Sequence, residues 1–341
     1  MFFVDRAVEL QSSTLFECTP RDFFKTAESQ YAFEVSVYNA ALTHVDRTYN
    51  LSSASVILIP FLPYLSSRTG KCDGKTHGQR LKELLHAVER APRTMPIVIT
   101  CTCVMEHAIF GQSLFDRLHA FSNVVQLAKA PRSYPKTLSN HVIVVPYFSV
   151  AQPSAACSEN GNILWRGSSS VAGRNATLVR ERIMSFRNHP AFNVSASRRR
   201  GECSVNTTCI TGNGLGRDKA AKERMRNEMA ESQFCLVPEG DSPESSRLAD
   251  AISSLCTPVV LSTRLPVLLS DIWKSTIVVI DQATFRNMNA DEVVRRVRSS
   301  NITCEMRLKL RHETLAATIL HRLDALVRQS SRAHVSSKIG R

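Results

Sequence analysis

The sequence predicts an α/β protein with two Rossmann-like domains that face a common cleft. First, a chain of 341 residues is longer than one hydrophobic core of ordinary size requires. Second, short continuous apolar runs alternate with segments of helical periodicity, which is typical of parallel sheets. Third, a segment rich in Pro, Ser and Ala separates two halves of this kind, and two such domains place a ligand between them. We expect an N-terminal domain at 1–150, a linker at 151–161, a C-terminal domain at 162–302, a helix at 303–330 and a basic tail at 331–341.

Each expected element follows from a local pattern. In the first half, buried strands are expected at 52–60, 96–103, 124–125 and 142–145, where Val and Ile run together. Amphipathic helices are expected at 29–45, 78–91 and 111–121, with a flexible loop rich in Gly, Lys and Ser at 66–77. In the second half, strands are expected at 162–165, 192–196, 234–237, 258–261 and 276–280. The helices there are expected at 174–187, 218–232, 244–255, 290–299 and 304–329.

Charge and composition exclude several classes of protein. With 43% apolar and 21% charged residues the chain is globular, and no run reaches the ~18 apolar residues of a membrane helix. A net charge of +13 predicts an anionic partner, which a nucleotide, nucleic acid, acidic polysaccharide or anionic membrane would each satisfy. Aromatic residues (7%) do not interleave with basic ones, which argues against single-stranded nucleic acid. The basic runs at 198–200 and 295–298 are either solvated faces or contacts for an acidic glycan or lipid.

The ten cysteines form no Cys-x-x-Cys pair, which argues against a zinc ribbon. Cys203 and Cys209 enclose a short polar segment, so they form either a short disulfide or two free thiols. Cys235 and Cys256 lie inside apolar runs, and we expect them to be buried small hydrophobic residues rather than bridge partners.

Asn-x-Ser/Thr sequons indicate a secretory compartment. They occur at Asn50, Asn175, Asn193, Asn206 and Asn301, more than the one or two that chance supplies by a rough estimate from the pattern. The first residues, MFFVDR, contain no apolar core of a signal peptide. The protein is therefore either cytosolic or attached by an anchor that this chain lacks.

The most informative segment is FCLVPEGDSPESSRLADAISSLCTPVVL, at 234–261. It is expected to form a strand, a polar loop, a helix and a second strand, so the loop lies at the carboxyl end of a strand, where open sheets bind ligands. In one interpretation Ser245, Ser246 and Arg247 bind an anion from the first turn of the helix, and Asp250 accepts from a ribose. In the other, these residues belong to an ordinary helix that is capped by Ser242, with an i,i+3 ion pair.

The segment NILWRG, at 162–167, is a second candidate for the same site. A strand ending at Arg166 would project its guanidinium at the same edge of the sheet, and Gly167 would permit close approach of the backbone. The alternative is an arginine that ends a strand in water. For Arg180, on the following helix, the choice is between phosphate binding and a solvated helix face.

These two segments, together with SSASVILIPFLPYL at 52–65, resemble the exostosin-like family of glycosyltransferases over roughly residues 20–300. The resemblance is specific because few unrelated folds place these motifs in the same order: Phe-Cys-Leu-x-Pro-x-Gly, Ser-x-Arg, Asp-Ala-Ile and Cys-x-Pro-Val. The chain departs from the family's pattern at two places. Leu255 stands where the family usually has Gly, and the family's Gly-Arg-Asp-His block in the first domain is replaced by PIVITCTCVMEH.

The resemblance implies a fold of the GT-B type and an inverting transfer from a nucleotide-sugar, usually UDP-linked, to a glycan or glycoconjugate. It also implies residence in the Golgi lumen as a membrane-anchored protein, which the sequons fit. The donor-binding residues would be Arg166, Gly167, Glu239, Gly240, Asp241, Ser245, Ser246, Arg247 and Asp250. No cofactor is expected, and homo- or hetero-oligomers are compatible with the sequence.

The catalytic base should come from the first domain. Glu106 and His107 follow an apolar strand and are candidates, although a surface position is the more ordinary explanation for each, and Asp73 and His77 in the loop are weaker ones. The chain has no Asp-x-Asp pair, so we expect no metal at the leaving diphosphate. Two other functions stay open: a non-catalytic protein of the same fold that binds glycans or anionic polymers, and a basic nucleic-acid-binding protein.

Overall fold

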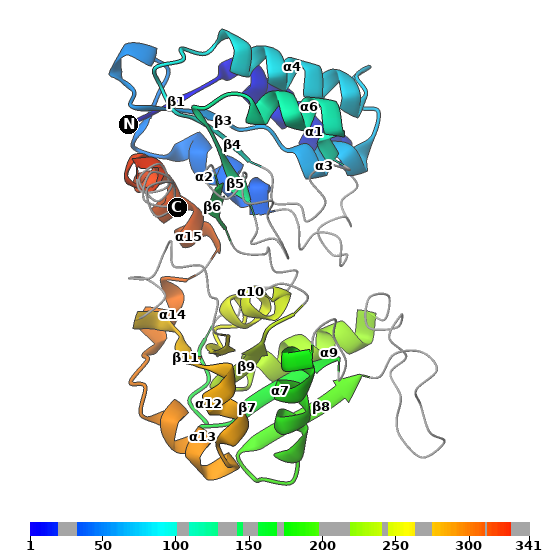
Figure 1. Ribbon diagram of the computed structural model, residues 1–341, viewed down its shortest axis with the longest axis vertical. Helices are drawn as coiled ribbons and strands as arrows, with labels where there is room; N and C mark the ends of the chain where they lie inside the picture. Colours follow the sequence, from blue (N-terminus) through cyan, green and yellow to red (C-terminus); the bar gives the residue numbers. More distant parts are fainter. Residues whose placement is uncertain are drawn as a thin grey trace, which may run out of the picture. The chain divides into compact units, whose positions relative to one another are not determined.

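The computed structural model describes most of the chain, and its parts form two compact units (Figure 1). The described residues are 1–19, 33–100, 109–128, 142–145, 156–168, 174–197, 219–240, 245–262, 275–310 and 312–328. The first unit contains the described residues up to 145 together with 312–328, and the second contains those from 156 to 310. The chain therefore returns to the first unit at its C-terminal end.

A parallel sheet with the strand order β2-β1-β3-β4-β5-β6 forms the centre of the first unit. Its strands are β1 (Phe2–Val4), β2 (Arg47–Thr48), β3 (Val56–Ile59), β4 (Ile97–Thr100), β5 (Val124–Ala128) and β6 (Val142–Val144). Every residue of β3 and β4 is buried, as their continuous apolar runs predict for strands covered on both faces.

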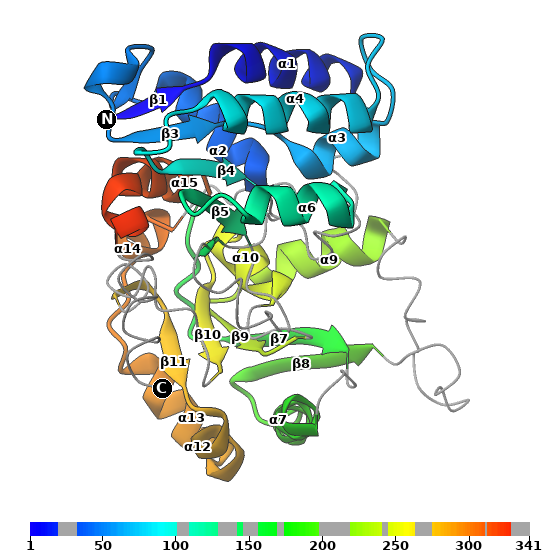
Figure 2. The same ribbon diagram turned by 45° about the horizontal axis from the view of Figure 1, so that its top comes forward.

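Helices cover both faces of this sheet (Figures 1 and 2). One layer contains α1 (Arg6–Cys18), α3 (Pro63–Thr69), α4 (His77–Arg90) and α6 (Gln112–His119). On the opposite face α2 (Phe33–Thr43) packs against α15 (His312–His321), and a short 3-10 helix, η3 (Leu51–Ser53), precedes β3. Leu81, Leu84, Leu85 and Val88 of α4 are buried, as their spacing predicts.

The turn after β3 is fixed by a buried carboxylate. Helix α3 begins with Pro63, and Leu62 before it provides no side-chain cap. The fully buried Glu34 of α2 supplies the missing acceptor, because the backbone N–H groups of Tyr64 and Leu65 donate to its two oxygens at 3.3 and 2.9 Å. The segment 60–64 (PFLPY), which follows β3, is thereby held against α2.

The second unit is built on a parallel sheet with the order β11-β10-β9-β7-β8. Its strands are β7 (Ile163–Ser168), β8 (Phe192–Ser197), β9 (Phe234–Pro238), β10 (Thr257–Leu261) and β11 (Val278–Ile280). In Figure 1, α9 (Lys219–Ala230) and α10 (Ser246–Ser253) lie on one face, and α7 (Arg174–Ser185), α12 (Gln282–Asn287) and α13 (Ala290–Arg298) lie on the other. Helix α14 (Cys304–Leu308) precedes the return to the first unit.

The two parallel sheets confirm the predicted class of two Rossmann-like α/β domains. The cleft between them and the linker boundaries stay predictions. The structure differs from the expected elements in several places. The sequence analysis predicted none of β1, α1, β2 and α12. Helix α3 and an ordered turn occupy most of 66–77, which were expected to form a loop, and the expected helix 304–329 is broken at 309–310 after α14.

Among the described cysteines, three disulfides join segments that lie apart in the sequence, Cys18–Cys72, Cys157–Cys304 and Cys235–Cys256. The Cys235–Cys256 disulfide shows that our expectation of two unbridged cysteines at these positions was wrong. The two residues are 1% exposed, and because β9 and β10 are neighbours in the sheet their Cα atoms lie 5.8 Å apart. Disulfides of this kind indicate folding in an oxidising compartment. Within the described ranges, no helix has the length and apolarity needed to cross a bilayer.

Candidate functional site

The topology of the second sheet marks one place for a ligand. From β7 the chain moves to the edge strand β8, then crosses back to place β9 on the other side of β7. The strand order therefore reverses between β7 and β9, and open α/β sheets bind ligands at the carboxyl ends of the strands at such a point. Arg166 and Gly167 lie at the carboxyl end of β7, and Glu239 and Gly240 follow β9. The sequence had assigned all four to the donor site.

Helix α10 begins directly beside this edge. Its N-cap is Ser245, whose Oγ accepts the backbone N–H of Arg247 at 3.3 Å, and Ser246 is the first helical residue. The helix therefore starts two residues later than the predicted Glu244. Asp241 and Ser242, which the sequence proposed as a donor ligand and as the N-cap, lie outside the described residues.

Arg247 makes the intrahelical pair that the second interpretation predicted. Its Nη1 lies 2.8 Å from Oδ2 of Asp250 and 2.8 Å from Sδ of Met225 on α9. The carboxylate is the more deeply buried partner, with 9% of the Asp250 side chain exposed against 27% for Arg247. Both interpretations of the segment are therefore compatible, because the ion pair uses only one nitrogen of the guanidinium.

Arg166 is not a strand-ending arginine in water. Its Nη2 donates to Oε1 of Glu228 on α9, and its Nε lies in ion-pair contact with Oε2 of the same carboxylate. Glu228 and Met225 are three residues apart on α9, a rise of about 4.5 Å along the helix. The guanidinium groups of Arg166 and Arg247 thus contact the same face of α9 about one turn apart.

A third arginine is buried beneath this edge. Arg180 of α7 is 6% exposed, and its Nη2 donates to the Glu239 carbonyl at 2.9 Å. The Glu239 carboxylate accepts from Ser262 Oγ at 2.5 Å, and Ser262 follows β10. Arg180 therefore fixes the end of β9, which corrects the interpretation of Arg180 as part of a solvated face.

Gly167 is needed for packing as well as for access. A Cβ at this position would lie 3.1 Å from Cζ2 of the Trp165 indole, which is itself buried in the core. Any larger residue would push against that ring. Strand β7 therefore carries no side chain at position 167, directly after Arg166.

The described residues at this edge carry equal numbers of positive and negative side chains. Arg166, Arg180 and Arg247 are accompanied by Glu228, Glu239 and Asp250, three positive groups and three negative ones. Among the residues that the structure describes, no group of three His, Cys, Asp or Glu side chains has the geometry to hold a metal ion. The predicted independence from a metal stays a prediction.

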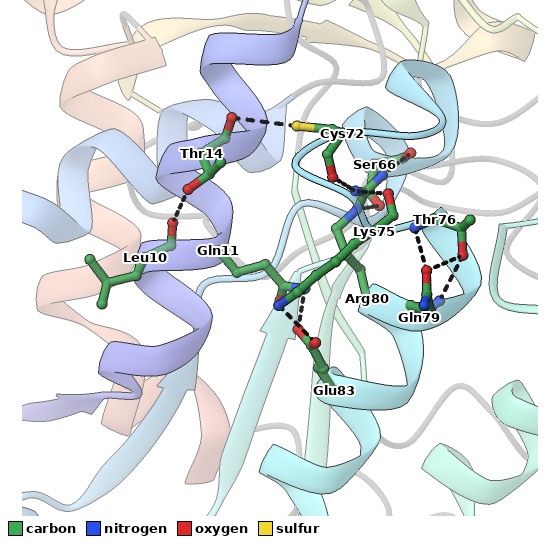
Figure 3. A network of polar contacts seen from close by, with 10 residues as sticks. All are labelled: Leu10, Gln11, Thr14, Ser66, Cys72, Lys75, Thr76, Gln79, Arg80 and Glu83. Atoms are coloured by element: carbon green, nitrogen blue, oxygen red, sulfur yellow. Dashed lines mark hydrogen bonds and ion pairs between the residues drawn. The ribbon is translucent and has the colours of Figure 1, made fainter.

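Figure 3 shows a polar network around Arg80 that involves the segment of the weaker base candidates, Asp73 and His77. The buried Arg80 donates to Ser66 Oγ at 2.8 Å and to the Lys75 carbonyl at 2.9 Å, and it also contacts the carbonyls of Gly70 and Cys72. These contacts hold the turn that carries Asp73. The segment 66–77 was expected to be a flexible loop, but α3 extends to Thr69 and Cys72 pairs with Lys75 across a turn. The sequence does not reveal that Arg80 holds this turn.

Both ring nitrogens of His77 are engaged in this network. The Ile109 carbonyl, 2.7 Å from Nε2, can only accept, so Nε2 carries the proton and Nδ1 accepts from Ser66 Oγ at 2.9 Å. Burial lowers the pKa of His77, the hydrogen bond to Ile109 opposes this, and the charge of Arg80 lowers the pKa further. A histidine with both nitrogens engaged is a poor candidate for the catalytic base.

Several predicted residues lie outside the described part of the chain. They are Glu106, His107, Asn206, the basic run 198–200 and the cysteines 203 and 209. Of the sequons, Asn50, Asn193 and Asn301 are exposed, and Asn175 lies in α7. The sequence reasoning missed Glu228 and Met225, because nothing in the pattern of the strongly charged α9 separates them from their neighbours.

Comparison with known proteins gives one family match. The description "Exostosin GT47 domain" matches residues 124–297, just over half of the chain, and this range includes all five described strands of the second sheet. No curated protein matches significantly.

Solved structures of glycosyltransferases show only distant similarity. The glycotransferase of kitacinnamycin is 11% identical with a TM-score of 0.38, over 97% of this chain and 98% of that one. TarM is 12% identical with a TM-score of 0.36, over 74% of this chain and 58% of that one. CalG4, the calicheamicin glycosyltransferase, is 11% identical with a TM-score of 0.34, over 81% of this chain and 73% of that one. These low scores add nothing to the family match.

Proposed function

The chain belongs to the exostosin GT47 family of glycosyltransferases, and from this premise we propose that it is an inverting enzyme that transfers a sugar from a UDP-sugar to a glycan or glycoconjugate. One observation supports the donor site above all. Arg247 extends from the first turn of α10, at the point where the strand order reverses, and only its Nη1 is engaged by the described residues. The remaining donors of a planar guanidinium suit two oxygens of a phosphate.

The proposed reaction is a single displacement at the anomeric carbon. The acceptor hydroxyl loses its proton to a base and attacks, and the bond to the diphosphate breaks as negative charge develops on the leaving oxygen. Arg247, Arg166 and the backbone N–H groups at the start of α10 would stabilise that charge. The base would come from the first unit, where Glu106 and His107 remain the candidates.

Other donor contacts follow from the same placement. Asp250 would accept from a ribose hydroxyl, and Glu239, Gly240 and Asp241 would approach the sugar or the base. Ser245 and Ser246 would add hydroxyl groups beside the phosphate. We further propose that transfer needs no metal, since the uncommitted donors of Arg247 and the backbone N–H groups at the start of α10 would face the diphosphate.

The donor site is tested by replacing Arg247. Calorimetry with UDP should show affinity lowered by about 1.5–3 kcal/mol in Arg247→Ala, because a charge-assisted contact is lost. Arg247→Lys should recover part of the affinity, since a point charge replaces a planar fork. The matched control is Arg296→Ala on α13, an exposed arginine far in sequence from the site, which should bind as the wild type does.

Equal UDP affinity in Arg247→Ala and the wild type would contradict this donor site. UDP binding without hydrolysis or transfer, with every acceptor tested, would instead favour a non-catalytic glycan-binding protein of the same fold.

The proposed location is the Golgi lumen. The disulfides between described cysteines and the exposed asparagines in the sequons at 50, 193 and 301 support a secretory address.

A further inference from the structure

The two arginines of the donor site differ in how much of each guanidinium is available. Arg166 directs Nε and Nη2 at the two oxygens of Glu228, which is the side-on fork that binds carboxylate or phosphate in two places. The contacting Nε and Oε2 atoms are sealed from solvent. Arg247 gives Nη1 alone to Asp250 and Met225, and its Nε and Nη2 donate to no residue in the described ranges.

A phosphate could therefore reach Arg247 without disturbing its partner. It could not bind Arg166 through the same two nitrogens while Glu228 remains there, because one carboxylate already occupies both. A ligand can reach the pair, because the remainder of the Arg166 and Glu228 side chains is 22% and 23% exposed.

We propose that Glu228 is an unassigned residue of the donor site, a counter-ion that occupies the phosphate position on Arg166 and that the second phosphate of the donor displaces. The proposal rests on the proposed function. It follows that Glu228 sets the affinity for a diphosphate and has little effect on a monophosphate, which the open side of Arg247 can bind alone. The contacts of the two guanidinium groups, about one turn apart on α9, suit adjacent phosphates.

The test compares uridine, UMP and UDP by calorimetry in the wild type, Glu228→Gln and Glu231→Gln. Glu228→Gln keeps the shape of the side chain and removes the competing charge, so UDP should bind about three- to tenfold more tightly. UMP should gain less, and uridine should not change. Glu231→Gln removes the same charge from an exposed position three residues away and should leave all three affinities unchanged.

Three outcomes would overturn the inference. Weaker UDP binding in Glu228→Gln would mean that the carboxylate holds Arg166 in place for the ligand, and an equal gain in Glu231→Gln would mean a general effect of charge. A gain for uridine as large as for UDP would mean that Glu228 does not compete with a phosphate.

Two further results complete the test. Glu228→Asp keeps the charge but shortens its reach, so it should bind UDP more tightly than the wild type does, and this comparison holds even if Glu228→Gln folds poorly. UDP affinity unchanged in Glu228→Asp would count against the inference. A folded wild type that binds no uridine nucleotide would contradict the proposed function itself, and the inference with it.

Discussion

Removing the disulfide Cys235–Cys256 should destabilise the second unit by a predictable amount. The bridge closes a loop with a sequence separation of 21, for which the chain-entropy model gives about 3 kcal/mol at 25 °C. Both residues are buried, so replacing them by alanine also removes packed volume and adds about 1 kcal/mol. We therefore expect the double variant Cys235→Ala/Cys256→Ala to lose about 3–4 kcal/mol of unfolding free energy.

Tryptophan fluorescence during urea denaturation is a suitable assay. The chain has two tryptophans, Trp165 and Trp273, and Trp165 is buried in the core of the second unit. The transition therefore reports the unit that contains the bridge. Cys18→Ala/Cys72→Ala removes the bridge of the first unit and is the control, since it should move this transition much less.

Two results would refute this reasoning. A double variant within about 0.5 kcal/mol of the wild type would show that the bridge contributes no constraint. Alkylation of Cys235 and Cys256 in the denatured, unreduced wild type would show that the bridge does not form and that our interpretation from the sequence was right.

Three further predictions concern pH, modification and metal. The pKa of His77 is lowered in the folded protein, so the unfolded chain binds more protons below its ordinary pKa of about 6.5, and stability should fall on acidification through that region. Urea midpoints at neutral and mildly acidic pH should show this fall, and His77→Gln should show a smaller one. A full-length form expressed in eukaryotic cells should migrate faster after treatment with an N-glycan amidase, and an unchanged band together with cytosolic fractionation would contradict a lumenal location. Transfer should survive exhaustive EDTA treatment; loss of activity that Mn²⁺ or Mg²⁺ alone restores would show that the diphosphate site needs a metal.

The alternation of strands and helices was predictable because it depends on local periodicity. Strands β3, β4, β9 and β10 are continuous apolar runs, and a buried strand of a parallel sheet requires such a run. Strand β1 escaped prediction because it has three residues and pairs with β3, more than 50 residues later. Its position depends on tertiary pairing, which no local pattern contains.

The candidate site was predictable only in part, for a related reason. Arg166 and Glu239 each follow a strand, and the carboxyl ends of parallel strands share one edge, so the sequence could place them together. Their partners come from helices packed across the sheet. Glu228 meets Arg166 from 62 residues away and Arg180 meets Glu239 from 59, and neither pairing has a signal in the spacing of residues.

The departure from the family pattern at Leu255 does not argue against the donor site. The position adopts the left-handed conformation that favours glycine, with φ of 55°, and a leucine there costs roughly 1–2 kcal/mol. The side chain is 1% exposed, and burying a leucine contributes about 1.5–3 kcal/mol, which is enough to offset that cost. The Leu255 carbonyl also accepts from the buried Arg307 at 2.9 Å, which secures the same turn. The backbone between α10 and β10 therefore keeps the conformation that a glycine would give it, and α10 still presents Arg247 at the edge of the sheet.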